Sequence, residues 1–331
     1  MPIGEILSLF VAVSWTVTAL FAEVGSKHMG SLPFNAIRMT LSLLFLGLAL
    51  WLTMGAPYPR YADGGTWLWL LLSGLVGYVM GDYCLMQGYI IIGSRFGQLF
   101  MTLSAPTAAL LGRLFIGEQM RPVALLGMAV TLSGIALTIL SKREASGTEG
   151  GKHGGLRLAL SPRGVFFAAM AGICQGAGLV LSKIGLNHYE LALAAQGLTE
   201  AVIPEGALLQ LPLRFSIPFA STMIRGIMGL AGFLLLLLFF AHDGGRQLSR
   251  ALRDRKAMWC AFASMFFGPF VGVSLSLMAT QYTATGIAQT LFALTPILII
   301  APSALLFGQR VTLREVVGAV VSVAGVCLFF V

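Results

Sequence analysis

The stretch Val76–Glu118, VGYVMGDYCLMQGYIIIGSRFGQLFMTLSAPTAALLGRLFIGE, decides the fold of this chain of 331 residues. It consists of two apolar segments separated by a very short turn, and its pattern occurs twice. A shift of 191 residues places five of the nine glycines between positions 76 and 134 on another glycine, where chance would give about one. The same shift carries Gln98 to Gln289, and each copy has a proline after this glutamine, Pro106 and Pro296. The sequence therefore predicts an internal duplication of a glycine-rich, proline-interrupted helix pair, which is typical of transporters.

The composition indicates a membrane protein. Hydrophobic residues make up 57% and charged residues 10% of the sequence, whereas a soluble domain has about 25% charged residues. The apolar residues come in ten runs, and a membrane-spanning helix needs about 20 such residues. We therefore expect an all-α polytopic protein with ten transmembrane helices, located in a bacterial inner (plasma) membrane. No basic segment precedes the first run, so we expect a span there and not a cleaved signal peptide.

The expected spans divide into two halves of five on either side of a polar linker. We place them at residues 4–22, 33–54, 67–91, 95–116, 122–140, 164–184, 218–241, 257–280, 284–307 and 312–331. Residues 1–140 then form the first five-helix repeat, residues 141–163 the linker and residues 164–331 the second repeat. The first helices of the two halves match at a shift of 160 instead, which implies an insertion at about 187–217. Because this segment is acidic and broken by prolines, we expect an interfacial helix or a lateral loop there.

The odd number of helices in each repeat determines how the repeats are oriented. The second copy must enter the bilayer inverted relative to the first, and such pairs commonly enclose a central site that opens alternately to either side. Of the 21 Lys and Arg residues, 14 lie in the loops after odd-numbered helices and 5 in those after even-numbered helices. This bias places the odd loops in the cytoplasm and both termini outside. The net charge of +8 is thus explained by topology or anionic lipid headgroups, without nucleic acid.

Several residues make the chain resemble the EamA-type family of the drug/metabolite transporter superfamily. Besides the ten spans, they are Arg38 and Arg225, just inside the second and seventh helices, and the segment SAPTAALLGRLFIGEQ (104–119) that ends the fourth helix. In this segment a proline is followed by an apolar run and then by Glu118, as is recurrent in the family. The second copy departs from the pattern because Gln309 replaces the acid.

The resemblance covers nearly the whole chain apart from the linker and the insertion. It implies a ten-helix transporter with a lysine near the end of a half's first helix, where this chain has Lys183 in the second half and Glu23 in the first. It also implies cytoplasmic termini, which opposes the charge count, so both orientations stay open. Relatives export amino acids, metabolites and drugs, and the substrate is therefore not specified.

Asp82 is the most informative polar residue inside a span, where unsatisfied polar groups are costly. Tyr78, Asp82 and Tyr89 are spaced so that they share one helical face. Two interpretations stay open. Asp82 is either a protonatable carboxylate in a central cavity, coupling solute movement to a proton gradient, or a hydrogen-bonding group between helices.

Gln98 and Gln289 are predicted to bind the substrate, because each copy keeps an amide that can both donate and accept hydrogen bonds. A bond between helices is the alternative. The prolines that follow, Pro106 and Pro296, are predicted to bend the fourth and ninth helices, either as gating elements or as tolerated kinks.

Trp15 and Gln175 occupy equivalent positions, at a shift of 160, near the middle of the first and sixth helices. A tryptophan at mid-membrane is not at its usual interfacial depth. Together with Tyr78 and Phe292, Trp15 forms either an aromatic wall for the substrate or part of the core.

Four further charges lie near helix ends. Glu23 and Arg38 flank the first loop, and we predict a structural or gating ion pair between them. Lys183 and Arg225 are expected at the opposite membrane face, where acids of the insertion would have to supply the counter-charge.

These features predict a secondary active transporter, an exporter of small polar or amphipathic metabolites of amino-acid-like or drug-like character that works by alternating access. No glycine-rich nucleotide-binding loop is present, so nothing indicates direct use of ATP. Coupling to protons and passive exchange remain, and Asp82 favours coupling to protons. The alternatives are a lipid or lipid-headgroup flippase and, less favoured, a membrane-embedded enzyme, which would need clustered Asp, His or Glu. We expect no enzymatic activity, cofactor or metal, a monomer, and the lipid bilayer and a small-molecule substrate as partners.

Overall fold

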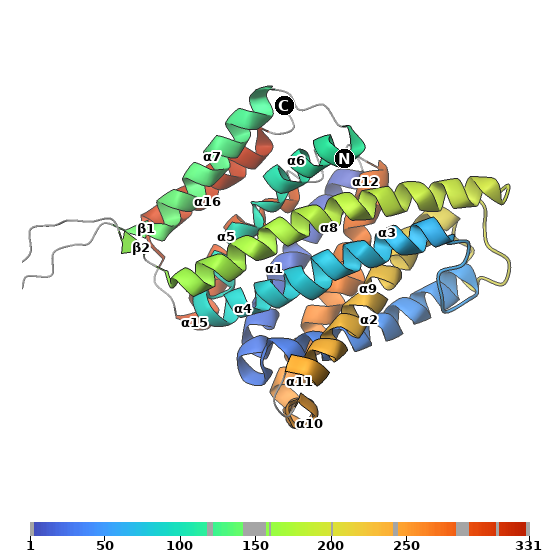
Figure 1. The fold of residues 1–331 in the computed structure, drawn as a ribbon, viewed down its shortest axis with the longest axis horizontal. Coiled ribbons are helices and arrows are strands. Elements are labelled where there is room, and N and C mark those ends of the chain that lie inside the picture. Colours follow the sequence, from blue (N-terminus) through green and yellow to red (C-terminus); the bar gives the residue numbers. More distant parts are fainter. Residues whose placement is uncertain are drawn as a thin grey trace, which may run out of the picture.

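The computed structural model describes residues 3–117, 122–141, 157–158, 160–199, 201–240, 244–282, 291–308 and 311–328. Gln289, Glu118, Gln309 and most of the linker lie outside these residues. The described part is a bundle of helices, and its strands are a single short pair (Figure 1).

The first half consists of helices joined by short connections. In chain order they are α1 (Ile3–Met29), α2 (Ser31–Met54), α3 (Gly64–Gly74), the π-helical η1 (Leu75–Asp82), α4 (Tyr83–Ile92), α5 (Ser94–Met101), α6 (Ser104–Ile116) and α7 (Pro122–Ile139). Gly30, between α1 and α2, and Gly93, between α4 and α5, have φ values of 83° and 85°. Glycine adopts this backbone conformation without strain, so both reversals are tight.

The described part of the second half follows a similar order, with an additional short helix before its π-helical segment and with the counterpart of α5 lying mostly outside the described residues. Its helices are α8 (Pro162–Ala195), α9 (Leu213–Phe240), α10 (Gly244–Arg253), α11 (Arg255–Met265), the π-helical η2 (Phe266–Gly272), α12 (Val273–Tyr282), α14 (Thr295–Leu298), α15 (Ile300–Phe307) and α16 (Leu313–Cys327). β1 (Leu140–Ser141) pairs antiparallel with β2 (Arg157–Leu158) next to the linker. The π-helical segments begin at Leu75 and Phe266, which are 191 residues apart, as the duplication predicts.

Seven helical stretches of the described chain are long and apolar enough to cross a bilayer, which makes this an integral multi-pass membrane protein. They are Ile3–Met29, Ser31–Met54, Gly64–Ile92, Ser94–Ile116, Pro162–Ala195, Leu213–Phe239 and Arg255–Ala279. Two shorter apolar helices, Leu126–Leu137 and Thr295–Phe307, fall on the expected fifth and ninth spans. Every expected span coincides with helix over at least part of its length, and residues 284–290 of the ninth lie outside the described chain.

Equivalent helices of the two halves pack against each other in a reciprocal way. α2 packs along α9, and α7 lies beside α16 (Figure 1). α1 packs against α11, η2 and α12, just as its equivalent α8 packs against α3, η1 and α4. Each of these contacts thus has a counterpart in which the helices of the two halves exchange roles.

The packing of α7 against α16 shows this reciprocity at the level of single residues. Thr131 Oγ1 donates a hydrogen bond to the carbonyl of Ser322 at 3.4 Å, and Ser322 Oγ donates one to the carbonyl of Thr131 at 3.3 Å. These residues are 191 positions apart. A methyl group added at Gly134 would meet Ser322, and one added at Gly325 would meet Thr131. Residue numbers therefore rise along α7 as they fall along α16, and the two helices are antiparallel.

The described residues of the segment 187–217 form the end of α8, a loop and the start of α9. α8 continues to Ala195, and the loop after it packs against the connection between α2 and α3. The Leu209 N–H donates to the carbonyl of Leu52 at 2.8 Å, and the buried Tyr189 hydroxyl donates to the carbonyl of Arg60. These bonds hold the end of α8 and the loop after it against the first half.

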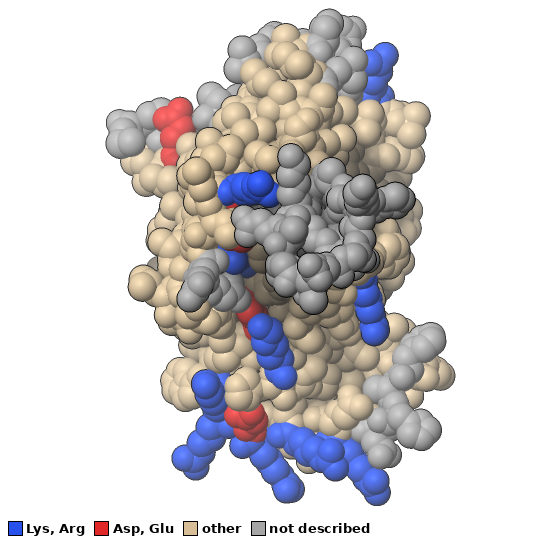
Figure 2. All heavy atoms as spheres, turned by 90° about the vertical axis from the view of Figure 1, so that its left-hand side faces the viewer, with Lys and Arg blue, Asp and Glu red and all other residues tan. Residues whose placement is uncertain are grey.

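Positive charge gathers at one end of the bundle. α10 is a short amphipathic helix that the sequence did not predict, with Arg246, Arg250 and Arg253 exposed and Ala251 buried. Figure 2 shows Lys and Arg side chains gathered at the lower edge of the face that lies on the left of Figure 1. α9 has 28 residues and is therefore about 42 Å long. Since α10 follows α9 and the insertion loop precedes it, the two lie at opposite ends of that helix.

Candidate solute-binding cavity

A cavity of about 190 Å³ lies between helices of the two halves. This space is enough for part or all of a small solute. Ten residues singled out from the sequence line it: Trp15, Arg38, Tyr78, Asp82, Tyr89, Gln98, Gln175, Arg225, Phe292 and Pro296. The structure thus brings together residues that are distant in the sequence, from both repeats.

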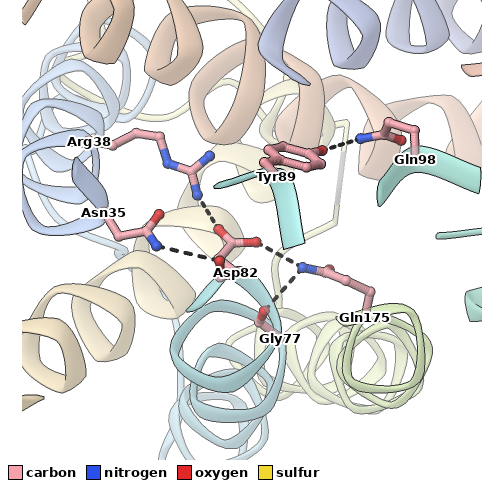
Figure 3. Close-up of polar contacts among 7 residues, drawn as sticks. All are labelled: Asn35, Arg38, Gly77, Asp82, Tyr89, Gln98 and Gln175. Atoms are coloured by element: carbon pink, nitrogen blue, oxygen red, sulfur yellow. Dashed lines mark hydrogen bonds and ion pairs between the residues drawn. The ribbon is translucent and has the colours of Figure 1, made fainter. Parts of the chain in front are cut away.

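Asp82 is the centre of a polar cluster in this cavity (Figure 3). Its Oδ2 atom forms an ion pair with the Arg38 guanidinium. Its Oδ1 atom accepts a hydrogen bond of 2.9 Å from Gln175 Nε2, which also donates to the carbonyl of Gly77 at 3.1 Å. Asn35 Nδ2 lies 3.5 Å from the Asp82 carbonyl. The carboxylate therefore connects three helices, α2, η1 and α8, two from the first half and one from the second.

Glycines in η1 allow this cluster to form. A Cβ added at Gly81 would lie 3.2 Å from Gln175 Nε2. Likewise, a Cβ added at Gly178 of α8 would lie 3.0 Å from the Cα of Gly77. Because neither position has a side chain, α8 approaches η1 closely enough for the amide of Gln175 to reach the carboxylate of Asp82.

Arg225 is the second guanidinium in the cavity. Its central carbon lies 4.8 Å from the centroid of the Tyr78 ring, within the range of a cation–π interaction. Within the described chain Arg225 has no ion-pair partner, and its Nε atom is buried without an acceptor. Tyr78 is buried as well, and its hydroxyl group has no hydrogen-bond partner among the described residues.

The positions equivalent to Gln175 and Asp82 in the other half of the chain are apolar. Trp15 occupies the place of Gln175, and Val273 occupies the place of Asp82. Trp15 packs against Phe292 with ring centroids 5.1 Å apart. A Cβ added at Gly272 would lie 2.8 Å from the Trp15 ring, so glycine again permits close helix packing. The cavity consequently has one polar wall and one apolar, aromatic wall.

Gln98 and the prolines lie where the fourth helix is interrupted. Gln98 Nε2 donates a hydrogen bond of 2.5 Å to the hydroxyl of Tyr89, so both face the cavity and contact each other (Figure 3). α5 ends at Met101. The next residue, Thr102, lies four positions before Pro106 of α6. A proline ring crowds the backbone carbonyl at this position, which interrupts the helix. Pro296 lies in α14 and lines the cavity, whereas Pro106 does not. Gln289 lies outside the described residues.

The predicted ion pair between Glu23 and Arg38 is wrong. Arg38 pairs with Asp82, whereas Glu23 accepts hydrogen bonds of 2.5 Å from Lys27 Nζ and 2.6 Å from the Ser94 N–H. Arg38 lies two turns inside α2, so its side chain reaches the cavity, while Glu23 lies near the end of α1, close to the start of α5.

The expected placement of Arg225 at the opposite membrane face is also wrong. Arg38 and Arg225 line the same cavity, because both lie well inside their helices. Lys183 is not among the residues that line it.

Several cavity residues gave no recognisable signal in the sequence. Thr18, Thr102 and Ser276 line the cavity, and each bonds to a carbonyl of its own helix. Hydroxyl side chains commonly do this in apolar helices, so their presence does not distinguish a cavity from a lipid-facing surface.

Comparisons with known proteins agree with this architecture. The model of the EamA-like transporter family matches residues 2–140 and 206–331, which is most of the chain. A solved crystal structure, described only as that of a protein, has a TM-score of 0.59 and 15% sequence identity, covering 98% of this chain and 95% of the other. At this identity the likeness concerns the fold alone. No match was found among curated proteins.

Proposed function

Because this chain belongs to the EamA-like transporter family, we propose that it is a secondary active transporter that exports small polar or amphipathic metabolites by alternating access. The observation that carries this proposal is the cavity between the two halves. Its walls hold two buried cations, one buried acid and an aromatic pair. Buried charges inside a bilayer are costly, and they mark solute pathways far more often than packing positions.

The proposed architecture is a monomer of ten transmembrane helices in two inverted repeats, in a bacterial plasma membrane. The antiparallel packing of α7 against α16, with reciprocal bonds between Thr131 and Ser322, supports the inversion. The reciprocal contacts of α1 and α8 support it as well. In such an arrangement, rocking of one repeat against the other exposes a central site to each side in turn.

We propose that Asp82 couples transport to protons. It is the sole acid among the described residues that line the cavity. Protonation of its carboxylate would remove the charge that holds Arg38, and would leave the bond with Gln175 between the two halves weaker. A change of one proton would thereby alter a contact across the interface that has to move.

Reconstitution into liposomes tests this function. Purified protein would be screened first with amino acids, polyamines, nucleosides, sugars and amphipathic drugs for compounds that raise its apparent melting temperature. Radiolabelled forms of the compounds found would then be measured for counterflow and for movement driven by a pH gradient. We expect saturable counterflow that is absent from protein-free liposomes. If no solute moves and fluorescent lipid crosses the bilayer instead, the protein is a flippase.

A matched pair of variants on one helix shows whether transport uses the cavity. Ala105 lines the cavity, whereas Leu114 of the same helix is 74% exposed on the outer surface. Ala105→Phe is expected to abolish counterflow by filling the cavity, and Leu114→Phe is expected to leave it unchanged. Both variants should elute as folded protein in size-exclusion chromatography. Equal activity in both would exclude the cavity as the transport site.

A further inference from the structure

We propose that the transported solute is an amphipathic organic anion whose carboxylate binds Arg225 and whose apolar body lies against Trp15 and Phe292. This inference rests on the proposed transport function and names the class of solute for the same cavity. Arg38 and Arg225 contribute two positive charges and Asp82 one negative charge, so the described lining is positive by one charge.

The unbalanced charge belongs to Arg225. Arg38 is already paired with Asp82. Arg225 is 94% buried, since only 6% of its surface is exposed, and no described acid pairs with it. The Tyr78 ring covers one face of its guanidinium at 4.8 Å. A buried cation without a counter-ion is strongly destabilising, and a ring face compensates only part of that cost. An anion in the cavity supplies the missing charge.

The chemistry of the guanidinium selects an oxyacid. Its planar fork of N–H donors matches the two oxygens of a carboxylate, and such charge-assisted pairs are stronger than neutral hydrogen bonds. A cationic solute would instead meet a positively charged wall, and a neutral solute would leave Arg225 uncompensated. The polar wall of the cavity is therefore suited to the charged end of an anion.

The apolar wall is suited to the remainder of the solute. Trp15 occupies the position in the first half that is equivalent to Gln175 of the second, and its ring is tilted by 55° to that of Phe292. An inorganic anion has no apolar surface that could contact these rings. The combination of one guanidinium and two aromatic rings in one cavity favours a carboxylate with an aromatic or branched aliphatic body.

Matched sets of probes test this assignment. Each set has one skeleton and three end groups: phenylacetate, phenylacetamide and phenethylamine, and likewise indole-3-acetate, indole-3-acetamide and tryptamine. Binding to detergent-purified full-length protein would be measured by isothermal titration calorimetry, and transport by counterflow in liposomes. We expect the carboxylate to bind more tightly than its amide by a factor of about ten or more, because a charge-assisted hydrogen bond contributes at least this much to affinity. The amine is expected to bind more weakly than either.

Two arginine variants on α9 assign the preference to one residue. Arg225→Gln is expected to remove the difference between carboxylate and amide, and Arg225→Lys to retain part of it. Arg214→Gln is the matched control, because Arg214 lies on the same helix, is exposed, and does not line the cavity. It should leave the preference unchanged.

The outcomes separate this inference from the transporter role. If amides or amines move as well as carboxylates, or if Arg225→Gln keeps the preference for carboxylates, the anion assignment is overturned while transport stands. Failure of every carboxylate in the panel to bind also overturns it. Absence of movement for all solutes, including those of the melting-temperature screen, would remove the transporter role itself.

Discussion

Arg38 of α2 and Asp82 of η1 form an ion pair inside the protein, 44 residues apart in the sequence. Their side chains are 4% and 10% exposed, respectively. Removing one partner of a buried pair leaves an uncompensated charge, which costs about 3–5 kcal/mol, whereas neutralising both partners is much less costly. The pair therefore predicts strongly non-additive effects on stability.

We expect Asp82→Asn to lower the free energy of unfolding more than Arg38→Gln. Without Asp82, two guanidiniums remain in the cavity with no acid beside them, whereas without Arg38 the carboxylate keeps its bond with Gln175 and the nearby charge of Arg225. The double variant should be more stable than the sum of the single effects predicts. Unfolding in mixed micelles followed by circular dichroism gives these values. Strict additivity would mean that the two side chains do not interact in the folded protein.

The coupling of transport to protons is predicted to depend on the same carboxylate. Asp82→Asn cannot release a proton, so we expect it to abolish accumulation driven by a pH gradient while counterflow of solute, which needs no net proton movement, persists at a reduced rate. The measurement compares both assays in the same liposomes. Gradient-driven accumulation that survives in Asp82→Asn would remove Asp82 from the coupling mechanism.

Most of the helices and several of the cavity residues were predictable from the sequence because they follow from periodic patterns. The 191-residue shift of the glycines correctly places η1 and η2 at equivalent positions, and the spacing of Tyr78, Asp82 and Tyr89 places all three on the cavity wall. Such patterns depend only on the spacing of residues along the chain, so a single sequence is enough to detect them.

The ion pairs were not predictable, because they depend on how far each charge lies along its helix and on which helices meet. Glu23 and Arg38 are close in sequence, so the sequence suggested a pair across the first loop. The structure instead directs Arg38 toward Asp82, since α2 meets the third span at α4, and leaves Glu23 near α5. The helix α10 was missed for a different reason. Its sequence is rich in charged residues, as in a loop, and the burial of Ala251 is evident only from the structure.

The hydrogen bond that Glu23 accepts from the start of α5 is predicted to contribute more to stability than the ion pair between Glu23 and Lys27. Its side chain is 1% exposed and accepts the Ser94 N–H, whereas Lys27 is 41% exposed. Glu23→Ala leaves a buried donor without an acceptor, which costs about 1–3 kcal/mol, while Lys27→Ala removes an exposed pair worth about 0–1 kcal/mol. Apparent melting temperatures in detergent should show this order. Exchanging the charges of Glu23 and Arg38 is expected to give no rescue, since these residues do not pair.

The cationic end that carries α10 is predicted to face the cytoplasm, because exposed Lys and Arg are retained on that side. A cysteine introduced by Ser249→Cys, on the exposed side of α10, should react with a membrane-impermeant maleimide in inside-out vesicles and not in intact cells. Thr199→Cys, in the insertion loop at the opposite end, should show the reverse. The protein without either substitution is the control for its four native thiols. Labelling of Ser249→Cys in intact cells would place α10 outside and both termini in the cytoplasm, which is the orientation opposite to that from the charge count.

Gly134 and Gly325 are predicted to be energetically equivalent, because each faces the other's helix in the antiparallel pair of α7 and α16. A Cβ at either position would meet the backbone of the partner helix at closer than normal contact, and overpacking of this kind costs about 1–3 kcal/mol. Gly134→Ala and Gly325→Ala should therefore lower the apparent melting temperature by similar amounts. Gly64→Ala is the matched control, because a Cβ there meets nothing within 4 Å and it should have little effect. Destabilisation by only one of the two interface variants would count against the proposed inverted repeat, on which the proposed alternating access depends.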